Sequence, residues 1–334
     1  MLEFLLLALF SQKDQNFLSH QTERILPEIE ALAPASLPQK KPEQVAPRLL
    51  ENPATAVLAF DSASGKTLLE KHANRPQPIA SLSKLMTALI ILENHDLDEI
   101  VTIPLEATQI NSSTIDVYQY EQMTVQTLLE ASLIASANDA ALALAMYHSR
   151  NESEFAKAMN ERAKALGLSS AKFFNATGLD IFPNSDEEQK AGESMAMSVQ
   201  RLYKSEELTK VQGNMMSTYD VLKLMRLLLK YDFVRETIAQ DHFYGTSADE
   251  KFFHEKPSTN QLLNTEFLSI TGGKTGFTYL AGECFVAVGH TPDGHEVITV
   301  LLGSLDRFGE TKALLSWIYD SFEWKGVQGA VSNE

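Results

Sequence analysis

Short apolar runs bounded by turn residues occur near both ends of the folded part of the chain. Residues 57–60 and 67–69 form two such runs on either side of a turn-rich stretch, which predicts a β-hairpin. Residues 268–271, 283–289 and 297–302 predict three more strands, the last two joined by a turn with Asp-Gly at its tip. We therefore expect one antiparallel sheet built from both chain ends.

Between these strands the apolar residues recur with helical periodicity. Amphipathic helices are predicted over residues 79–92, 153–166, 218–230 and 310–323. A longer helical pattern runs from Thr124 to Tyr147 and is interrupted at residues 136–139. The predicted fold class is α/β of the α+β type, with helices packed on the sheet and a helical subdomain inserted at about residues 95–215.

The chain before the first predicted strand has a different composition. Residues 4–10 are an apolar run too short to span a membrane, so residues 1–10 are either the remnant of a signal or anchor segment or the start of an amphipathic helix. Residues 11–52 are polar and rich in proline, as in an extended linker. We expect a folded domain over residues 53–325 and a tail over residues 326–334.

Composition narrows the possible functions. The 334 residues carry a formal net charge of −16 without a cluster of Lys or Arg, which argues against a partner that is a nucleic acid or an anionic membrane. The single cysteine, Cys284, excludes an intrachain disulfide and lies in an apolar run typical of a buried strand. The eight histidines are scattered, so we expect neither a metal site nor a cofactor.

Ser81 and Lys84 are the first candidates for chemistry. They lie three residues apart at the start of a predicted helix, so one helical turn would bring the lysine amine to the serine hydroxyl. Unpaired N–H groups at the helix start would favour an oxyanion there. The pair predicts a serine nucleophile with a lysine base. A plain N-cap serine fits the same spacing, and Ser-x-x-Lys recurs at residues 169–172.

Two further polar clusters interrupt apolar segments. Ser136-Ala137-Asn138 occupies the helix break, where an exposed hydroxyl and a carboxamide would face a cleft. Lys274-Thr275-Gly276 follows a predicted strand, and the glycines around it allow a ligand to approach the backbone closely. A helix cap and an ordinary turn are the structural alternatives. The sequence contains neither a P-loop nor a Gly-x-Ser-x-Gly nucleophile elbow.

In this order the three clusters resemble the motifs of the serine penicillin-recognising enzymes: Ser-x-x-Lys, a Ser-x-Asn-type triplet and Lys-Thr/Ser-Gly. The neighbouring residues are most similar to the D-alanyl-D-alanine carboxypeptidases, the low-molecular-mass penicillin-binding proteins. The resemblance covers about residues 53–323 and implies a β-lactamase/transpeptidase-like fold. It continues through residues 159–168, 174–180, 217–220, 259–263, 273–282 and 303–308.

The resemblance also implies a role for individual residues. Ser81 would be the nucleophile, Lys84 its base, and Ser136 the relay that passes a proton to the departing amine. Burial and the like charge of Lys274 would lower the pKa of Lys84. The backbone N–H groups of Ser81 and Phe277 would form the oxyanion hole. The implied substrate-binding residues are Asn138, Lys274, Thr275, Gly276, Phe277 and Arg307, with Thr275 and Arg307 at the terminal carboxylate.

The implied activity is removal of the terminal D-Ala from peptidoglycan stem peptides that end in D-Ala-D-Ala, through an acyl-enzyme that β-lactam antibiotics also form. Three alternatives stay open: a D,D-endopeptidase that cleaves peptidoglycan cross-links, a serine β-lactamase and a non-enzymatic scaffold. The substrate implies an exported protein of the cell envelope, with membrane contact at most through the N-terminus. Residues 181–216 exceed the connection usual in the family and form either a lid or a solvated excursion.

Overall fold

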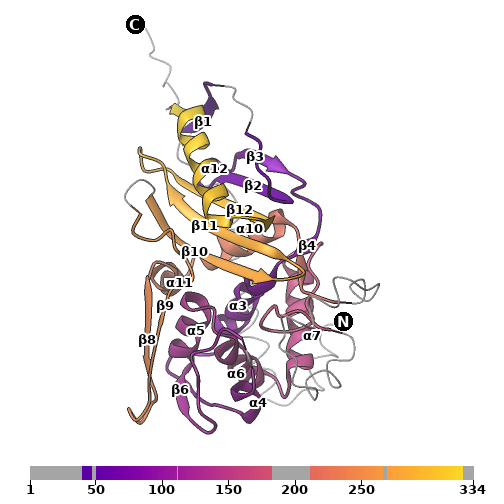
Figure 1. The fold of residues 1–334 in the computed structure, drawn as a ribbon, viewed down its shortest axis with the longest axis vertical. Coiled ribbons are helices and arrows are strands. Elements are labelled where there is room, and N and C mark those ends of the chain that lie inside the picture. Colours follow the sequence, from indigo (N-terminus) through magenta and orange to yellow (C-terminus); the bar gives the residue numbers. More distant parts are fainter. Residues whose placement is uncertain (1–39, 47–49, 111, 183–210, 266–268, 326–334) are drawn as a thin grey trace, which may run out of the picture.

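The computed structural model describes residues 40–46, 50–110, 112–182, 211–265 and 269–325 (Figure 1). Residues 1–10, with the candidate signal or anchor remnant, the tail at residues 326–334 and most of the long connection at residues 181–216, predicted as a lid or a solvated excursion, lie outside these ranges.

A five-stranded antiparallel sheet forms the centre of the fold (Figure 1). Its order is β10 (Ser269–Thr278), β11 (Gly282–His290), β12 (Glu296–Ser304), β2 (Ala56–Asp61) and β3 (Thr67–Lys71). The predicted hairpin forms β2 and β3, and the three C-terminal strands pair beside them as expected. The prediction of one antiparallel sheet from both chain ends is confirmed.

Alternation of side chains along the strands explains why both faces of the sheet are buried. In β11, Cys284 and Val286 belong to the core on one face, whereas Phe285 and Ala287 belong to the core on the other. Helix α12 (Arg307–Ser321) covers the Phe285 face, and α10 (Thr218–Leu228) packs on the opposite face. Burial also raises the pKa of the Cys284 thiol to about 12.

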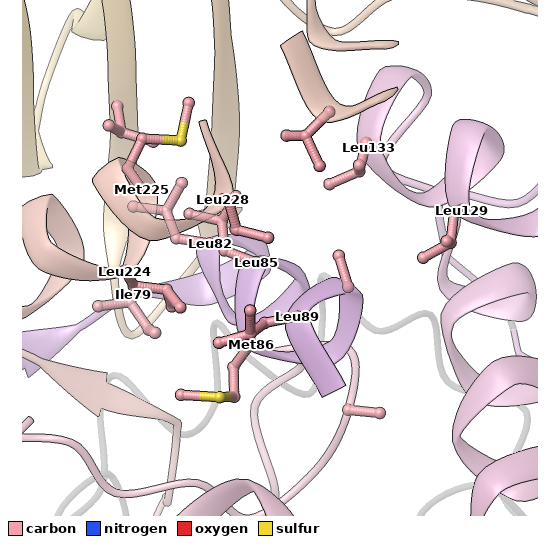
Figure 2. Close-up of a cluster of buried hydrophobic side chains, with 14 of the residues drawn as sticks. Ile79, Leu82, Leu85, Met86, Leu89, Leu129, Leu133, Leu224, Met225 and Leu228 are labelled. Carbon is pink, nitrogen blue, oxygen red and sulfur yellow. The ribbon is translucent and has the colours of Figure 1, made fainter. Parts of the chain in front are cut away.

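Helix α3 (Lys84–Asn94) lies in the larger core. Its neighbours include α5 (Val125–Ile134), α6 (Asn138–His148), α7 (Glu152–Ala165) and α10. Leu85 and Leu89 of α3 belong to an apolar cluster that includes Leu129 of α5 and Leu228 of α10 (Figure 2). Eight of the eleven α3 residues are buried, so α3 is a core helix and not an amphipathic surface helix.

Several short elements carry too little sequence pattern to be predicted. Strand β5 (Ile100–Thr102) pairs antiparallel with β6 (Gln122–Thr124), and a hairpin joins β8 (His242–Thr246) to β9 (Phe253–Pro257). A further pair joins β4 (Gln77–Pro78) to β7 (Met215–Met216). Helices α4 (Leu105–Thr108) and α11 (Asp232–Ile238) are likewise short. Hairpin β8–β9 and helix α11 pack against α5.

The segment predicted as a linker contains one strand of the folded protein, which corrects the boundary drawn from sequence. Strand β1 (Lys41–Gln44) pairs antiparallel with β13 (Phe322–Lys325), an arrangement that tolerates Pro42 because this two-stranded sheet has open edges. The indole of Trp324 donates a 2.9 Å hydrogen bond to Asp61 of β2. A proline-rich composition alone does not reveal a partner strand 280 residues away.

The last helix also differs from its predicted range of 310–323. The Asp306 side chain accepts a hydrogen bond from the Gly309 N–H and caps the helix, so α12 begins at Arg307. After Ser321 the chain turns into β13. None of the helices in the described ranges is long and apolar enough to cross a bilayer.

The α3 core gives a stability prediction. Leu89→Ala should lower the free energy of unfolding by about 2–5 kcal/mol, because a fully buried leucine is replaced by a cavity. Leu105→Ala, at a position that is 46% exposed, should change it by less than about 0.5 kcal/mol. Urea unfolding followed by circular dichroism measures both. Equal losses in the two variants would contradict the packing described for α3.

Candidate active site

Ser81 lies on a turn of 3₁₀-helix, η2 (Ala80–Ser83), directly before α3, rather than in the α-helix that the sequence predicts. Ala80 has φ = +47°, a conformation that non-glycine residues adopt only under constraint. The Ser81 side chain makes no helix-capping hydrogen bond, so the N-cap alternative is wrong. The tight turn leaves Ser81 only partly buried at the front of α3.

Two glycines allow the backbone to close around this turn. A Cβ atom on Gly178 would lie 1.9 Å from the Ala80 carbonyl oxygen, and Gly178 itself has φ = +85°. A Cβ atom on Gly276 would lie 3.1 Å from the Ser81 backbone nitrogen. Gly276 therefore permits the edge strand β10 to approach Ser81 closely. No role of this kind was predicted for Gly178 from the sequence.

The Lys84 amine makes three hydrogen bonds in the protein interior. It lies 2.9 Å from Ser81 Oγ, 2.7 Å from Asn138 Oδ1 and 2.8 Å from the Thr177 carbonyl oxygen. Asn138 Oδ1 and the carbonyl can only accept, whereas the serine hydroxyl can also donate. When Lys84 is neutral, its two N–H groups satisfy the two acceptors and its lone pair faces Ser81.

Burial lowers the pKa of Lys84 from 10.5 to about 7, although the negative charges of Asp139 and Glu152 oppose this effect. From the sequence, the positive charge of Lys274 is expected to lower the pKa of Lys84. The structure instead shows this like-charge effect on the pKa of Lys274. Burial lowers the pKa of Lys274 well below its usual range, and the nearby charges of Lys84 and Arg307 lower it further. Both lysines are thus far easier to deprotonate than exposed lysines.

Ser136 and Asn138 lie at the break between α5 and α6, as the interrupted helical pattern predicts. Ser136 has φ = +58°, which turns the chain between the two helices. Both side chains are buried, with 5% and 2% of the residue exposed, which corrects the expected exposed hydroxyl. The Asn138 Nδ2 group donates to the Ser112 carbonyl at 2.6 Å, and this contact directs Oδ1 to Lys84.

Lys274, Thr275 and Gly276 lie within β10 and do not follow it, because this strand is longer than the apolar run that predicted it. The Lys274 amine donates to Ser136 Oγ at 2.7 Å and to the Thr275 carbonyl at 2.9 Å. The Thr275 hydroxyl lies 2.6 Å from that of Thr259, a partner that sequence reasoning missed.

Arg307 and Phe277 complete the predicted set. Arg307 comes from the start of α12, and one guanidinium nitrogen donates to the Gly276 carbonyl at 2.9 Å. Its Nε is buried without a hydrogen-bond partner in the described part of the chain. The Phe277 side chain is 53% exposed, so it contributes little to the core.

The second Ser-x-x-Lys sequence does not form an equivalent pair. Ser169 and Lys172 lie after α7, and the Lys172 amine is 4.7 Å from the centre of the Phe174 ring.

Sequence reasoning missed Asn214 as a residue that supports the site. The signal that could have found it is a polar residue in apolar surroundings. Asn214 donates to Ser83 Oγ at 2.9 Å and its carbonyl accepts from the Ile79 N–H, so it ties the Ser81 turn to β7.

The arrangement can support nucleophilic catalysis. The Ser81 hydroxyl is partly exposed, and the lone pair of the neutral Lys84 amine faces it. The Ser136 hydroxyl is held by a second buried amine, that of Lys274. Among the described residues, no group of three or more His, Cys, Asp or Glu side chains gathers in a way that could hold a metal ion.

Comparison with known proteins agrees with this geometry. A family model described as D-alanyl-D-alanine carboxypeptidase matches residues 41–305. The carboxypeptidase DacF of Bacillus subtilis is 30% identical over 281 residues, which are 82% of this chain and 64% of DacF. A D-alanyl-D-alanine endopeptidase of Escherichia coli is 25% identical over 268 residues, 79% of this chain and 76% of that protein. The chain thus spans slightly less than two thirds of DacF.

Solved structures show the same fold. Penicillin-binding protein D2 of Listeria monocytogenes, in its ampicillin-bound form, is 29% identical with a TM-score of 0.63, covering 82% of this chain and 100% of that one. A D-alanyl-D-alanine carboxypeptidase of Mycobacterium tuberculosis is 20% identical with a TM-score of 0.68, covering 86% of this chain and 98% of that one. Since the family model spans the elements that carry Ser81, Ser136 and Lys274, the chain belongs to the D-alanyl-D-alanine carboxypeptidase family.

Proposed function

We propose that this protein is a serine-type D-alanyl-D-alanine carboxypeptidase that removes the terminal D-Ala from peptidoglycan stem peptides. The observation that carries the proposal is the 2.9 Å contact between Ser81 Oγ and the fully buried Lys84 amine. An alkyl hydroxyl needs an adjacent base to become a nucleophile at neutral pH. A lysine with a pKa of about 7 can be that base.

In the acylation step, neutral Lys84 takes the Ser81 proton while Ser81 Oγ attacks the carbonyl carbon between the two D-alanines. The backbone N–H groups of Ser81 and Phe277 stabilise the oxyanion, a proposal supported by the close approach of Gly276 to Ser81. Collapse of the tetrahedral intermediate breaks the peptide bond. Ser136, supported by Lys274, relays the proton that Lys84 took from Ser81 to the departing amine, which leaves Lys84 neutral again. Asn138 holds the peptide group of the substrate.

In deacylation, neutral Lys84 takes a proton from a water molecule whose oxygen attacks the carbonyl carbon of the Ser81 ester. The ester bond then breaks, the proton passes from Lys84 to Ser81 Oγ, and the shortened peptide is released. Before acylation, Thr275 and Arg307 hold the carboxylate of the terminal D-Ala, and a fixed guanidinium recognises a carboxylate well.

β-Lactam antibiotics acylate Ser81 in the same way as the substrate does, in keeping with the ampicillin-bound relative. The substrate lies outside the cytoplasmic membrane, so the protein acts in the cell envelope, with its N-terminus as the candidate tether.

D,D-endopeptidase activity on peptidoglycan cross-links is the second candidate. Proteins named D-alanyl-D-alanine endopeptidase from Escherichia coli and Pseudomonas aeruginosa are each 25% identical to this chain, which covers 76% of each of them. Both reactions need the same nucleophile. They differ in the group that leaves when the peptide bond breaks, which is the terminal D-Ala in the carboxypeptidase reaction and the cross-linked peptide in the endopeptidase reaction. Release of D-Ala from a pentapeptide, compared with cleavage of a purified cross-linked dimer, distinguishes the two activities.

Incubation with benzylpenicillin tests the nucleophile. Intact-protein mass spectrometry should show a stable increase by the mass of one drug molecule, because Ser81 opens the β-lactam ring and keeps the acyl group. Ser81→Ala should show no increase. Rapid loss of the drug without an adduct would indicate a β-lactamase. An intact drug and no adduct would contradict the enzymatic proposal.

The acylation rate should depend on pH through Lys84. The base must be neutral, so the rate should rise between pH 5 and 8 with a midpoint near the pKa of about 7. Well below that midpoint it should fall about tenfold for each pH unit. Stopped-flow measurement of penicillin acylation, with circular dichroism at each pH to confirm folding, gives the profile. A flat profile would show that Lys84 is not the base.

Arg307→Gln tests the carboxylate site. The Michaelis constant for a D-Ala-D-Ala peptide should rise about 10- to 100-fold, since a hydrogen bond to a charged group is lost. The matched control is Lys312→Gln on the exposed side of α12, which should leave the Michaelis constant unchanged. Equal Michaelis constants in Arg307→Gln and the unchanged protein would remove Arg307 from the substrate-binding set.

A further inference from the structure

Glu152 is a carboxylate whose charge acts on the Lys84 amine and which the catalytic cycle above does not use. It begins α7, where it is partly buried, and its Oε1 accepts a hydrogen bond from the Ala176 N–H at 3.1 Å. Burial raises the pKa of Glu152, whereas the Ala176 hydrogen bond and the positive charge of Lys84 oppose that effect.

The backbone held by Glu152 is the same backbone that holds Lys84. The Ala176 carbonyl accepts from Thr87 Oγ1 at 2.8 Å, and the Thr177 carbonyl accepts from the Lys84 amine at 2.8 Å. Residues 176 and 177 therefore bridge the start of α7 to the first turn of α3. Loss of the Glu152 contact would release the Ala176 N–H from α7. Ala176 directly precedes Thr177, whose carbonyl accepts from Lys84.

Charge gives Glu152 a second effect on the same amine. The charged groups that influence the Lys84 amine are Asp139 of α6 and Glu152 of α7. Lys274 of β10 is a further titratable amine, and its own pKa is lowered by burial and by the charge of Lys84. Asp139 accepts hydrogen bonds from the Ile115 and Val117 N–H groups and so also holds a loop. Among the residues that the structure describes, the Glu152 carboxylate accepts one backbone hydrogen bond, which a glutamine oxygen could preserve. The titratable His148, at the end of α6, faces α7, and its ring centre lies 5.6 Å from that of Phe155. His148 is not among the groups that shift the pKa of Lys84.

We propose that Glu152 is a positioning residue for Lys84. Its hydrogen bond holds the 176–177 backbone against the Lys84 amine, and its negative charge stabilises the ammonium form of that amine. The proposal rests on the proposed function in one respect, that Lys84 is the base for Ser81. In the described part of the chain, the hydrogen bond that Glu152 makes is to the Ala176 N–H and not to Ser81.

The alternative is that Glu152 only complements the dipole of α7. Glu154 shares the first turn of this helix but is exposed and pairs with Lys157 at 2.7 Å, so it provides a matched control. Removing either negative charge has the same effect on the dipole. Only removal of the Glu152 charge should alter Lys84.

The test compares Glu152→Gln, Glu152→Asp and Glu154→Gln. Penicillin acylation is measured from pH 5 to 9, and the Lys84 amine is titrated directly by NMR in protein labelled with ¹⁵N-lysine. In Glu152→Gln both midpoints should move about 0.5 to 1 pH unit lower, because a charge that favours the ammonium form is lost. Glu152→Asp should restore the midpoints at least in part, and Glu154→Gln should leave them unchanged.

Three results would overturn the proposal. The first is an unchanged Lys84 titration in Glu152→Gln, and the second is an equal change in Glu154→Gln. The third is a slower reaction with an unmoved midpoint, which indicates a structural role alone. The NMR titration needs no activity, so failure of the proposed function is recognised separately. In that case the unmodified protein is not acylated, while the Lys84 midpoint still moves in Glu152→Gln.

Discussion

Burial of one lysine amine is the constraint on which the site depends. An isolated ammonium group inside a protein is costly unless polar partners surround it. Lys84 receives two pure acceptors from distant parts of the chain, Asn138 Oδ1 and the Thr177 carbonyl. The remaining partner is Ser81. The same three contacts that make the buried amine tolerable direct its lone pair at the nucleophile once a proton is lost.

The fold supplies these partners from separate elements. Helix α3 carries Lys84 into the core, and the break between α5 and α6 supplies Asn138. The edge strand β10 carries a second buried lysine, Lys274, to Ser136. The helices are fixed by apolar packing, and β10 is fixed by its pairing with β11, so the polar groups meet without having to provide the stability of the fold.

Backbone strain occurs at two of the three polar clusters. Ala80 and Ser136 are both non-glycine residues with positive φ, each next to or within a reactive group. Such conformations cost about 1–3 kcal/mol and persist only where surrounding contacts determine them. At Ala80 those contacts are visible, because its carbonyl accepts from Ser83 Oγ at 2.7 Å while Gly178 leaves room for it.

The sequence by itself determined the local features of this protein. The i to i+3 spacing brought Ser81 and Lys84 together, short apolar runs bounded by turn residues predicted the strands of the sheet, and the interrupted helical pattern located Ser136 and Asn138. The tertiary structure alone decided which distant residues meet. Lys274 reaches a serine 138 positions away, and Thr177, Thr259 and Glu152 acquire their contacts only through packing. The reason is physical: local spacing fixes neighbours along one element, whereas contacts between elements depend on how their apolar faces pack.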